Sequence, residues 1–291
     1  MPDEILLDII SYLKPYDIYH GFFNLNERFN SIINDFQLDF HFDISHISKN
    51  EFDYCLSSIL SQSCVQLRLQ SLHLSNDETY GAIARFLRSY SNLSLPYLRS
   101  LSIVDANTEQ IKILLFRLSS NRLESISLQT NRTIDINDKR FICETLLKHK
   151  SLRSCRLSFC DGVDCDETIL NNPINNQLEN IIIDLSYFQN ILTLLSYIPN
   201  VKRLTININQ QKYYNQDYDA AAFDVVRLSI PTQLTYFNLN LKFSNVEFEH
   251  IEQLLTCLVN LKHLCCSSFR AELVIQSKFQ FSMLTLCFLL D

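Results

Sequence analysis

Three cysteines and three aspartates lie close together near the middle of the chain and form its densest group of potential metal ligands. They are Cys155, Cys160, Cys165, Asp161, Asp164 and Asp166. A zinc site usually needs two close cysteine pairs, or cysteines together with histidines, and no second pair follows here. Cys155 also falls at an apolar position of the repeat described below. We therefore interpret these thiols as small buried hydrophobic groups and expect no metal and no cofactor.

The seven histidines show no catalytic arrangement. None is paired with a cysteine or serine at a recognisable catalytic spacing. The chain also lacks G-x-S-x-G, H-E-x-x-H and a glycine-rich phosphate loop. With only three glycines in 291 residues, a phosphate cradle built from backbone amides is not expected. We predict that the chain is not itself an enzyme.

The composition is typical of a packed globular protein and not of a disordered one. Hydrophobic residues make up 47% of the chain and charged residues 20%. The net charge is −7, and the 25 lysines and arginines are scattered along the sequence. Affinity for nucleic acid depends on clustered cations that release counterions from phosphates. We therefore expect no nucleic-acid partner.

No segment predicts a membrane span or a secretory signal. The longest apolar run, residues 283–290, is far shorter than the roughly 20 residues that cross a bilayer. Asp3 and Glu4 lie where the basic region of a signal peptide would be. We expect no membrane association, a cytoplasmic or nuclear location, and reduced thiols at the ten cysteines.

One phrase recurs along most of the chain: an aliphatic residue, two variable residues, an apolar residue, one variable residue and another aliphatic residue. Successive copies begin 23 to 33 residues apart. The copies are Leu69-Leu72-Leu74, Leu98-Leu101-Ile103, Leu123-Ile126-Leu128, Leu152-Cys155-Leu157, Leu178-Ile181-Ile183, Val201-Leu204-Ile206, Leu234-Phe237-Leu239 and the incomplete Leu261-Leu264. This phrase and its spacing resemble leucine-rich repeats, whose periods are roughly 20–29 residues.

The segments between these phrases have the apolar spacing of helices. They cover residues 79–90, 108–118, 139–148, 188–198, 220–228 and 248–258, and Thr108 is placed to cap the second of them. A strand, a turn and a helix in each period resemble the ribonuclease-inhibitor type of leucine-rich repeat. The resemblance implies an α/β repeat fold, a solenoid of parallel strands alternating with helices, in which each strand buries its apolar side against its own helix.

The remaining positions of each phrase point out of the predicted core, because side chains alternate along a strand. They are Ser71, His73, Ser75, Ser100, Ser102, Val104, Ser125, Ser127, Gln129, Ser154, Arg156, Ser158, Asn180, Ile182, Asp184, Arg203, Thr205, Asn207, Tyr236, Asn238 and Asn240. Tyrosine and arginine are favoured at the centres of protein interfaces. We hypothesise that a protein partner binds near Arg156, Arg203 and Tyr236. The alternative is a solvated sheet face without a partner.

The first 33 residues have the pattern of three short helices. We expect Asp3 to cap a first helix in which apolar residues recur at helical spacing as far as Leu13. Pro15 should stop this helix, and further helices are predicted from about Tyr16 to Phe23 and from about Glu27 to Ile33. Three short helices cannot bury this much apolar surface alone, so the segment must pack against something else.

This segment resembles the F-box, the three-helix motif of ubiquitin-ligase substrate receptors. The matching residues are Pro2, Glu4-Ile5-Leu6, Ile9, Tyr12-Leu13, Asp17-Ile18 and Leu25-Asn26-Glu27-Arg28-Phe29. Met1 replaces the usual leucine, and Phe29 stands where many members have tryptophan. The resemblance extends over about a seventh of the chain. It divides the chain into an F-box-like helical motif at residues 1–37 and a leucine-rich-repeat solenoid at residues 38–291.

The resemblance implies a substrate-recognition subunit of a cullin–RING (SCF-type) E3 ubiquitin ligase. Such a subunit binds the adaptor protein and, through it, cullin, while the repeats bind a protein substrate. The matching residues imply adaptor contacts from Pro2, Ile5, Leu6, Ile9, Ile10, Leu13 and Ile18. Some of these must instead pack the three helices together. The alternative is a cytosolic leucine-rich-repeat scaffold without a ubiquitin role, in which the helices only cap the solenoid.

Four further expectations concern segments outside the repeated phrases. Residues 38–44 alternate strictly between apolar and polar types, which predicts a strand that joins the helices to the repeats without a linker. A helix is expected at residues 50–60, after Ser48. The polar residues 210–218 predict a loop. Residues 279–290 lack polar residues that would cap a solenoid, so we expect the solenoid to be incomplete at its C-terminus.

Overall fold

The structure is a computed structural model. It describes residues 2–34, 39–45, 47–77, 79–90, 95–118, 122–165, 177–209, 231–242, 248–268 and 285–288. The chain divides into two units, Met1–Gln129 and Thr130–Asp291. Within the described ranges, no helix combines the length and the apolar character needed to cross a membrane.

The first unit begins with the three predicted helices, α1 (Asp3–Ser11), α2 (Pro15–Gly21) and α3 (Glu27–Ile33). The expectation that Asp3 caps α1 is wrong, because Pro2 holds the N-cap position and Asp3 lies in the first turn. Pro15 starts α2, where its missing N–H is not needed, and α1 has already ended at Ser11. The side chain of Asn26 caps α3 by accepting a hydrogen bond of 3.0 Å from the Phe29 N–H.

The predicted strand after these helices is confirmed as β1 (Phe40–Asp43), with Phe40 and Phe42 buried and the two residues between and after them exposed. The helix expected after Ser48 is also confirmed. Ser48 and Glu51 form a capping box at the start of α4 (Lys49–Tyr54), which continues as the π-helix η1 (Cys55–Ile59). A short helix, α5 (Ser63–Gln66), leads into the next strand.

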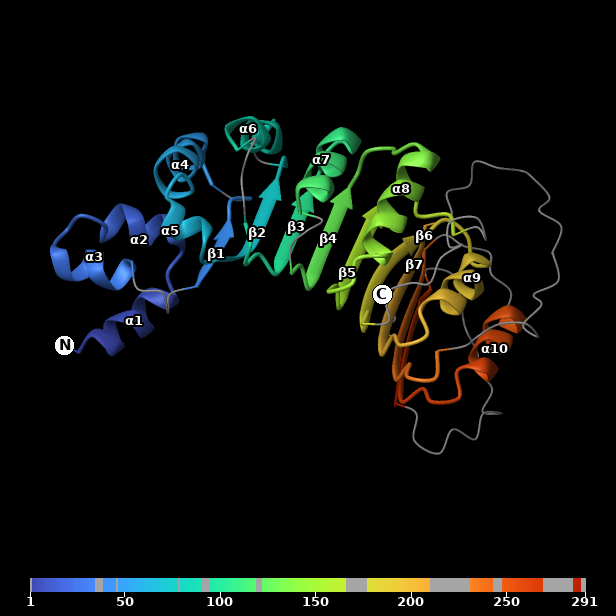
Figure 1. Ribbon diagram of the computed structural model, residues 1–291. Coiled ribbons are helices and arrows are strands. Elements are labelled where there is room, and N and C mark those ends of the chain that lie inside the picture. The colour runs from blue at the N-terminus through green and yellow to red at the C-terminus, as the bar shows by residue number, and fades with distance from the viewer. Residues whose placement is uncertain are drawn as a thin grey trace. The chain divides into compact units, whose positions relative to one another are not determined.

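Three further parallel strands complete the sheet of the first unit: β2 (Leu69–Ser75), β3 (Ser100–Val104) and β4 (Ser125–Thr130). The apolar residues of the repeated phrase stand in register, so that Leu72 lies beside Leu101 and Leu101 beside Ile126. Helices α4, α6 (Ala82–Ser89) and α7 (Thr108–Leu118) cover the face of the sheet on which these residues are buried (Figure 1).

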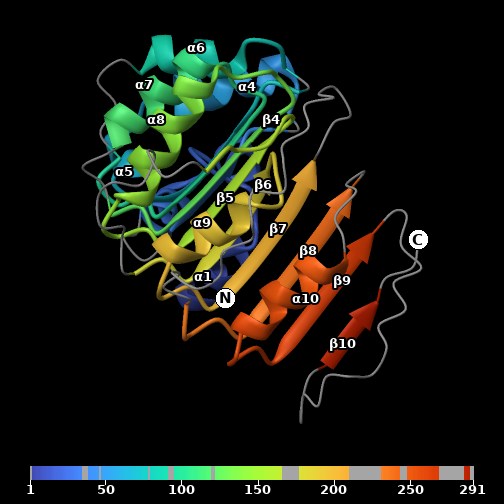
Figure 2. The same cartoon turned by 90° about the vertical axis from the view of Figure 1, so that its right-hand side faces the viewer.

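The second unit repeats this arrangement with strands β5 (Ser154–Phe159), β6 (Asn180–Leu185), β7 (Arg203–Asn209), β8 (Tyr236–Lys242), β9 (His263–Ser268) and β10 (Thr285–Phe288). All described pairings are parallel and follow the chain order. The helices are α8 (Ile136–Leu147), α9 (Asn190–Tyr197) and α10 (Phe248–Cys257), and α9 and α10 run beside β6 to β9 (Figure 2). An α/β repeat arrangement with parallel strands is therefore confirmed in each unit.

Several details differ from the sequence-based expectations. The N-terminus of α7 is capped by Asn107, whose side chain accepts a hydrogen bond of 2.9 Å from Gln110, and not by Thr108. Helix α8 begins three residues before Lys139, because Asp135 provides its cap. Strand β10 was not predicted and pairs with β9. The predicted loop at 210–218 and the predicted helix at 220–228 lie outside the described residues.

The three glycines of the chain occupy very different backbone environments. A Cβ atom at Gly162 would lie 2.5 Å from the Leu185 carbonyl carbon, and its φ is +71°. Gly81 has a φ of +77° but open space around it. Gly21, at the end of α2, has neither restriction. Gly162 is the position where both the backbone angle and the close approach of another strand require glycine.

We predict graded effects of alanine substitution at these glycines on the free energy of unfolding, measured by denaturant titration. Gly162→Ala should cost about 3 kcal/mol or more, because steric overlap with the Leu185 backbone adds to the left-handed conformation. Gly81→Ala should cost about 1 kcal/mol, and Gly21→Ala should change stability by less than about 0.5 kcal/mol or raise it slightly. Equal losses of stability for Gly81→Ala and Gly162→Ala would contradict the close approach of the Leu185 backbone to Gly162.

Candidate functional site

One side of helix α1 exposes large apolar side chains to solvent. Ile5 is 48%, Ile9 47% and Tyr12 89% exposed. Their spacing of four and three residues places them in one stripe along the helix. Isolated exposed apolar residues are common, but a contiguous stripe on one helix is typical of a surface that binds another protein. We call Ile5, Ile9 and Tyr12 the α1 stripe.

The opposite side of α1 is held against the rest of the first unit. Ile10 is only 1% exposed, and Leu6, Leu7 and Leu13 are half-buried. Helix α1 contacts α3, and the Asp3 carboxylate pairs with the Arg28 guanidinium at 2.7 Å. Both charged partners are half exposed or more, so this ion pair contributes at most about 1 kcal/mol. The buried apolar side therefore determines the orientation of α1.

Helices α2 and α3 are fixed to strand β1 by a buried aromatic and cationic contact. The Tyr19 ring lies 6.0 Å from Phe40, and the Arg68 guanidinium lies 4.7 Å from the centre of the same Phe40 ring. Arg68 is 3% exposed and donates a hydrogen bond of 2.9 Å to the Ile33 carbonyl at the end of α3. Burial raises the pKa of Tyr19, so its hydroxyl stays neutral. The three helices are thus mounted directly on the sheet.

The residues implied as adaptor contacts fall into three groups in the structure. Pro2, Ile5 and Ile9 are exposed. Leu6 and Leu13 are half-buried. Ile10 and Ile18 are each 1% exposed and pack inside the first unit. Tyr12 was matched to the motif but not chosen as a contact, although its position seven residues after Ile5 was a usable signal.

The three predicted partner-binding residues of the strands are all in the second unit, and two of them meet. Arg203 on β7 stands in register with Tyr236 on β8, and its guanidinium lies 4.7 Å from the centre of the tyrosine ring. Arg156 on β5 is exposed and stands beside Ile182 on β6, which separates it from β7.

A ladder of polar side chains crosses the second unit from β5 to β9. Asp184 accepts hydrogen bonds from Ser158 at 2.7 Å and from Asn207 at 2.5 Å. Asn240 donates to Asn207 at 2.6 Å, and Ser267 donates to Asn240 at 2.5 Å. Asp184 shares the outward-facing side with Ser158 and Asn207, but the ladder covers it and leaves it only 5% exposed.

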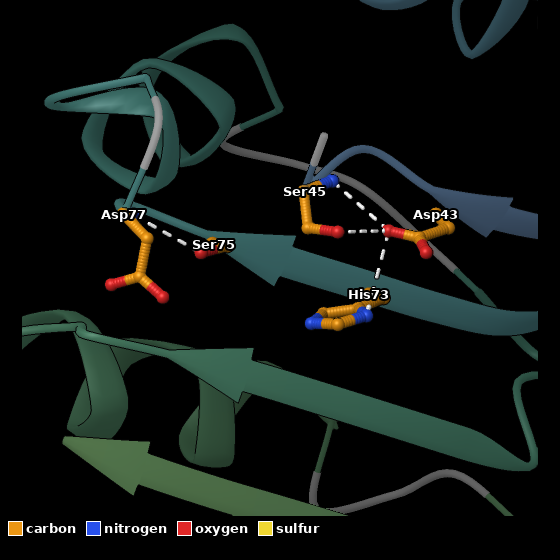
Figure 3. A network of polar contacts seen from close by, with 5 residues as sticks. All are labelled: Asp43, Ser45, His73, Ser75 and Asp77. Atoms are coloured by element: carbon orange, nitrogen blue, oxygen red, sulfur yellow. Dashed lines mark hydrogen bonds and ion pairs between the residues drawn. The ribbon is translucent and has the colours of Figure 1, made fainter. Parts of the chain in front are cut away.

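A serine, a histidine and one aspartate side chain also meet in the first unit, near the ends of β1 and β2 (Figure 3). The Asp43 carboxylate lies 3.5 Å from His73 Nδ1 and accepts hydrogen bonds from the backbone N–H and the hydroxyl of Ser45. Nucleophilic catalysis would require the serine hydroxyl to contact the histidine. Here Ser45 donates to Asp43 instead. Ser75, predicted to face outward, is 3% exposed and accepts a hydrogen bond from the Asp77 N–H.

The cysteines of the suspected metal cluster lie largely in the core. Cys155 and Cys165 are 2% and 5% exposed, and Cys160 is half-buried. Among the residues that the structure describes, which exclude Asp166, no three histidine, cysteine or acidic side chains are placed to hold a metal ion. Burial raises the pKa of Cys155 to about 12 and the pKa of its neighbour Cys143 to about 12. Such thiols stay protonated and act as apolar groups.

A search against protein-family models gives no match for this chain, and a comparison with curated proteins gives none either.

The raised pKa values predict a loss of stability in alkaline solution. Cys143 and Cys155 keep their protons in the folded chain, whereas in the unfolded chain they lose them above the ordinary value of 9.0. The free energy of unfolding should therefore fall as the pH rises from 9 toward 12. At about pH 11 the loss should be on the order of 2 kcal/mol for each thiol.

Denaturant titrations at several pH values, on the natural chain and on Cys143→Ala/Cys155→Ala, test this expectation. The variant should be less stable at neutral pH because of the cavities that it creates, but should lose less stability between about pH 9 and pH 11. Parallel pH profiles for the two proteins would show that these thiols do not titrate on unfolding.

Proposed function

We propose that this chain is the substrate-recognition subunit of a cullin–RING (SCF-type) E3 ubiquitin ligase. In this proposal the helices α1 to α3 are an F-box-like motif that binds the adaptor and, through it, cullin. The strands and helices that follow are leucine-rich repeats that bind a protein substrate. The chain positions the substrate, and the chemistry of ubiquitin transfer takes place on other subunits.

The observation that carries the proposal is the exposure of the α1 stripe. The sequence of this segment matches the F-box pattern, and the structure leaves Ile5, Ile9 and Tyr12 without cover in the first unit. Fully burying an isoleucine side chain is worth about 1.5–3 kcal/mol, so a partner that covers this stripe gains several kcal/mol. We assign the adaptor contacts to Pro2, Ile5, Ile9 and Tyr12, supported at their edge by Leu6 and Leu13.

The same observation weighs against the alternative of a repeat protein whose helices only cap the sheet. A cap would bury the apolar residues of α1 against its own strands. Ile10 and Ile18 are buried in this way, but Ile5 and Ile9 are not. The direct mounting of α2 and α3 on β1, through Tyr19 and Phe40, supports a rigid connection between the adaptor-binding helices and the strands of the first unit.

The repeat assignment is supported by the regular placement of the phrase on successive strands. Each complete copy has its three apolar residues buried, and each strand pairs in register with the next within its unit. We infer a ribonuclease-inhibitor-like solenoid from this arrangement. The free thiols of the described cysteines suit a reducing compartment, and we place the protein in the cytoplasm or the nucleus.

The test is binding of purified SCF adaptor protein to the full chain, measured by isothermal titration calorimetry. The double variant Ile5→Asp/Ile9→Asp should weaken binding by about 100-fold or more, because two buried carboxylates replace apolar contacts at the centre of the interface. Both positions are about half exposed in the free chain, so the variant should fold, and its circular dichroism spectrum should match that of the natural chain.

A matched control is Ile113→Asp/Val259→Asp, which changes two other exposed aliphatic residues at 39% and 77% exposure. This control should bind the adaptor as the natural chain does. Absence of adaptor binding by the natural chain would refute the proposal. Unchanged binding by Ile5→Asp/Ile9→Asp would refute the assignment of the α1 stripe.

A further inference from the structure

The strands of the second unit gather basic side chains that are far apart in the sequence. Six exposed residues lie on, or one residue before, strands β5, β7 and β9: Arg153, Arg156, Lys202, Arg203, Lys262 and His263. They belong to the beginnings and middles of these strands. In a chain with a net charge of −7, this concentration of positive charge is a local exception. Because side chains alternate along a strand, Arg156, Arg203 and His263 share the outward-facing positions, and we call these three residues the basic strand surface.

Two acidic residues in the described part of the second unit lie near this surface. Glu179 pairs with Lys202 at 3.1 Å. Asp184 is buried and accepts hydrogen bonds from Ser158 and Asn207. By contrast, Arg153, Arg156, Arg203 and Lys262 form no ion pair with any residue in the described part of this unit. Among the described residues of this unit, Arg156 and Arg203 therefore have no ion-pair partner.

The centre of the surface is ordered before any partner arrives. Arg203, Tyr236 and His263 stand in register on β7, β8 and β9. The guanidinium stacks on the tyrosine ring, and the tyrosine and histidine rings lie 6.5 Å apart. The adjacent polar ladder ties β5 through β9 together by side-chain hydrogen bonds. A preordered arginine loses less conformational entropy when it forms a bidentate pair with a carboxylate.

We propose that the basic strand surface binds an extended acidic segment of a partner protein, with its carboxylates on Arg156 and Arg203. The inference deepens the proposed function and rests on it, because it names the chemical class of substrate that the repeats recognise. Four steps between neighbouring strands, from β5 to β9, span about 19 Å, which is the length of about six residues of extended chain.

The size of the surface favours an acidic peptide over nucleic acid. A short run of glutamates or aspartates places its charges only over the basic strand surface. A polynucleotide continues its negative charge beyond these strands, where a chain of net charge −7 repels it. Arginine also matches the planar, bidentate geometry of a carboxylate. These cations are far apart in the sequence and come together when the strands pair in register.

The experiment measures fluorescence anisotropy of a labelled oligoglutamate peptide, about six residues long, with the full chain. The peptide should bind, and binding should weaken steeply between about 50 mM and about 300 mM NaCl. Arg156→Ala/Arg203→Ala should weaken binding by at least about 10-fold, and Arg156→Lys/Arg203→Lys should give an intermediate affinity because charge remains without the bidentate geometry. Oligoglutamine of equal length should not bind.

The matched control is Arg88→Ala/Arg99→Ala, which removes two exposed cations from the first unit and should change the affinity by less than about 2-fold. The proposal would be overturned if Arg156→Ala/Arg203→Ala and Arg88→Ala/Arg99→Ala bound the peptide with equal affinity. The proposal would also be overturned, in favour of nucleic acid, if an oligothymidylate bound the natural chain more tightly than the peptide and Arg156→Ala/Arg203→Ala abolished that binding.

The adaptor-binding variant separates this inference from the proposed function. Ile5→Asp/Ile9→Asp should bind the acidic peptide as the natural chain does, because its changes lie in the other unit. Peptide binding without adaptor binding by the natural chain would refute the ubiquitin-ligase role and keep the acidic-segment site. Adaptor binding without peptide binding would refute the acidic-segment site and keep the role.

Discussion

The in-register burial of one side of every strand is the constraint on which the rest of the structure depends. In each unit the apolar rows, such as Leu72, Leu101 and Ile126, stack between neighbouring strands and face the helices. Each such side chain contributes about 1.5–3 kcal/mol through burial. Because side chains alternate along a strand, the residues between these buried ones point to the opposite face of the sheet. Arg203 and Tyr236 meet there as a consequence of register, with no local interaction in the sequence to bring them together.

Much of this pattern could be predicted because alternation and helical period are local properties of the sequence. Helix α7 begins and ends where its apolar spacing indicated, and the second apolar residue of every copy of the phrase lies on a strand. The burial of Asp184 could not be predicted in this way. Its cover comes from Ser158 and Asn207 on neighbouring strands, and only the register places them beside it. Strand β10 was missed because it lacks the phrase and takes its partner from β9.

The orientation of helix α1 could also be predicted only in part from the sequence. The apolar residues of this helix cover more than half of its circumference, so the sequence indicates amphipathicity but not which apolar residues face inward. The structure buries Ile10 and leaves Ile5 and Ile9 about half exposed. Arg68 adds a contact that no local pattern indicates, since its partners, Ile33 and Phe40, are about thirty residues earlier in the chain.

The two proposed binding surfaces rely on different physical forces, and this difference has a functional consequence. The α1 stripe is apolar, so its binding free energy depends on buried area and changes little with salt. The basic strand surface depends on charge, which accelerates encounter but is screened within about 8 Å at physiological ionic strength. Under these proposals, the chain would hold its adaptor persistently and exchange acidic partners rapidly. Rapid exchange suits a subunit that must present many substrate molecules in turn, whereas a stable adaptor complex keeps it attached to the ligase between them.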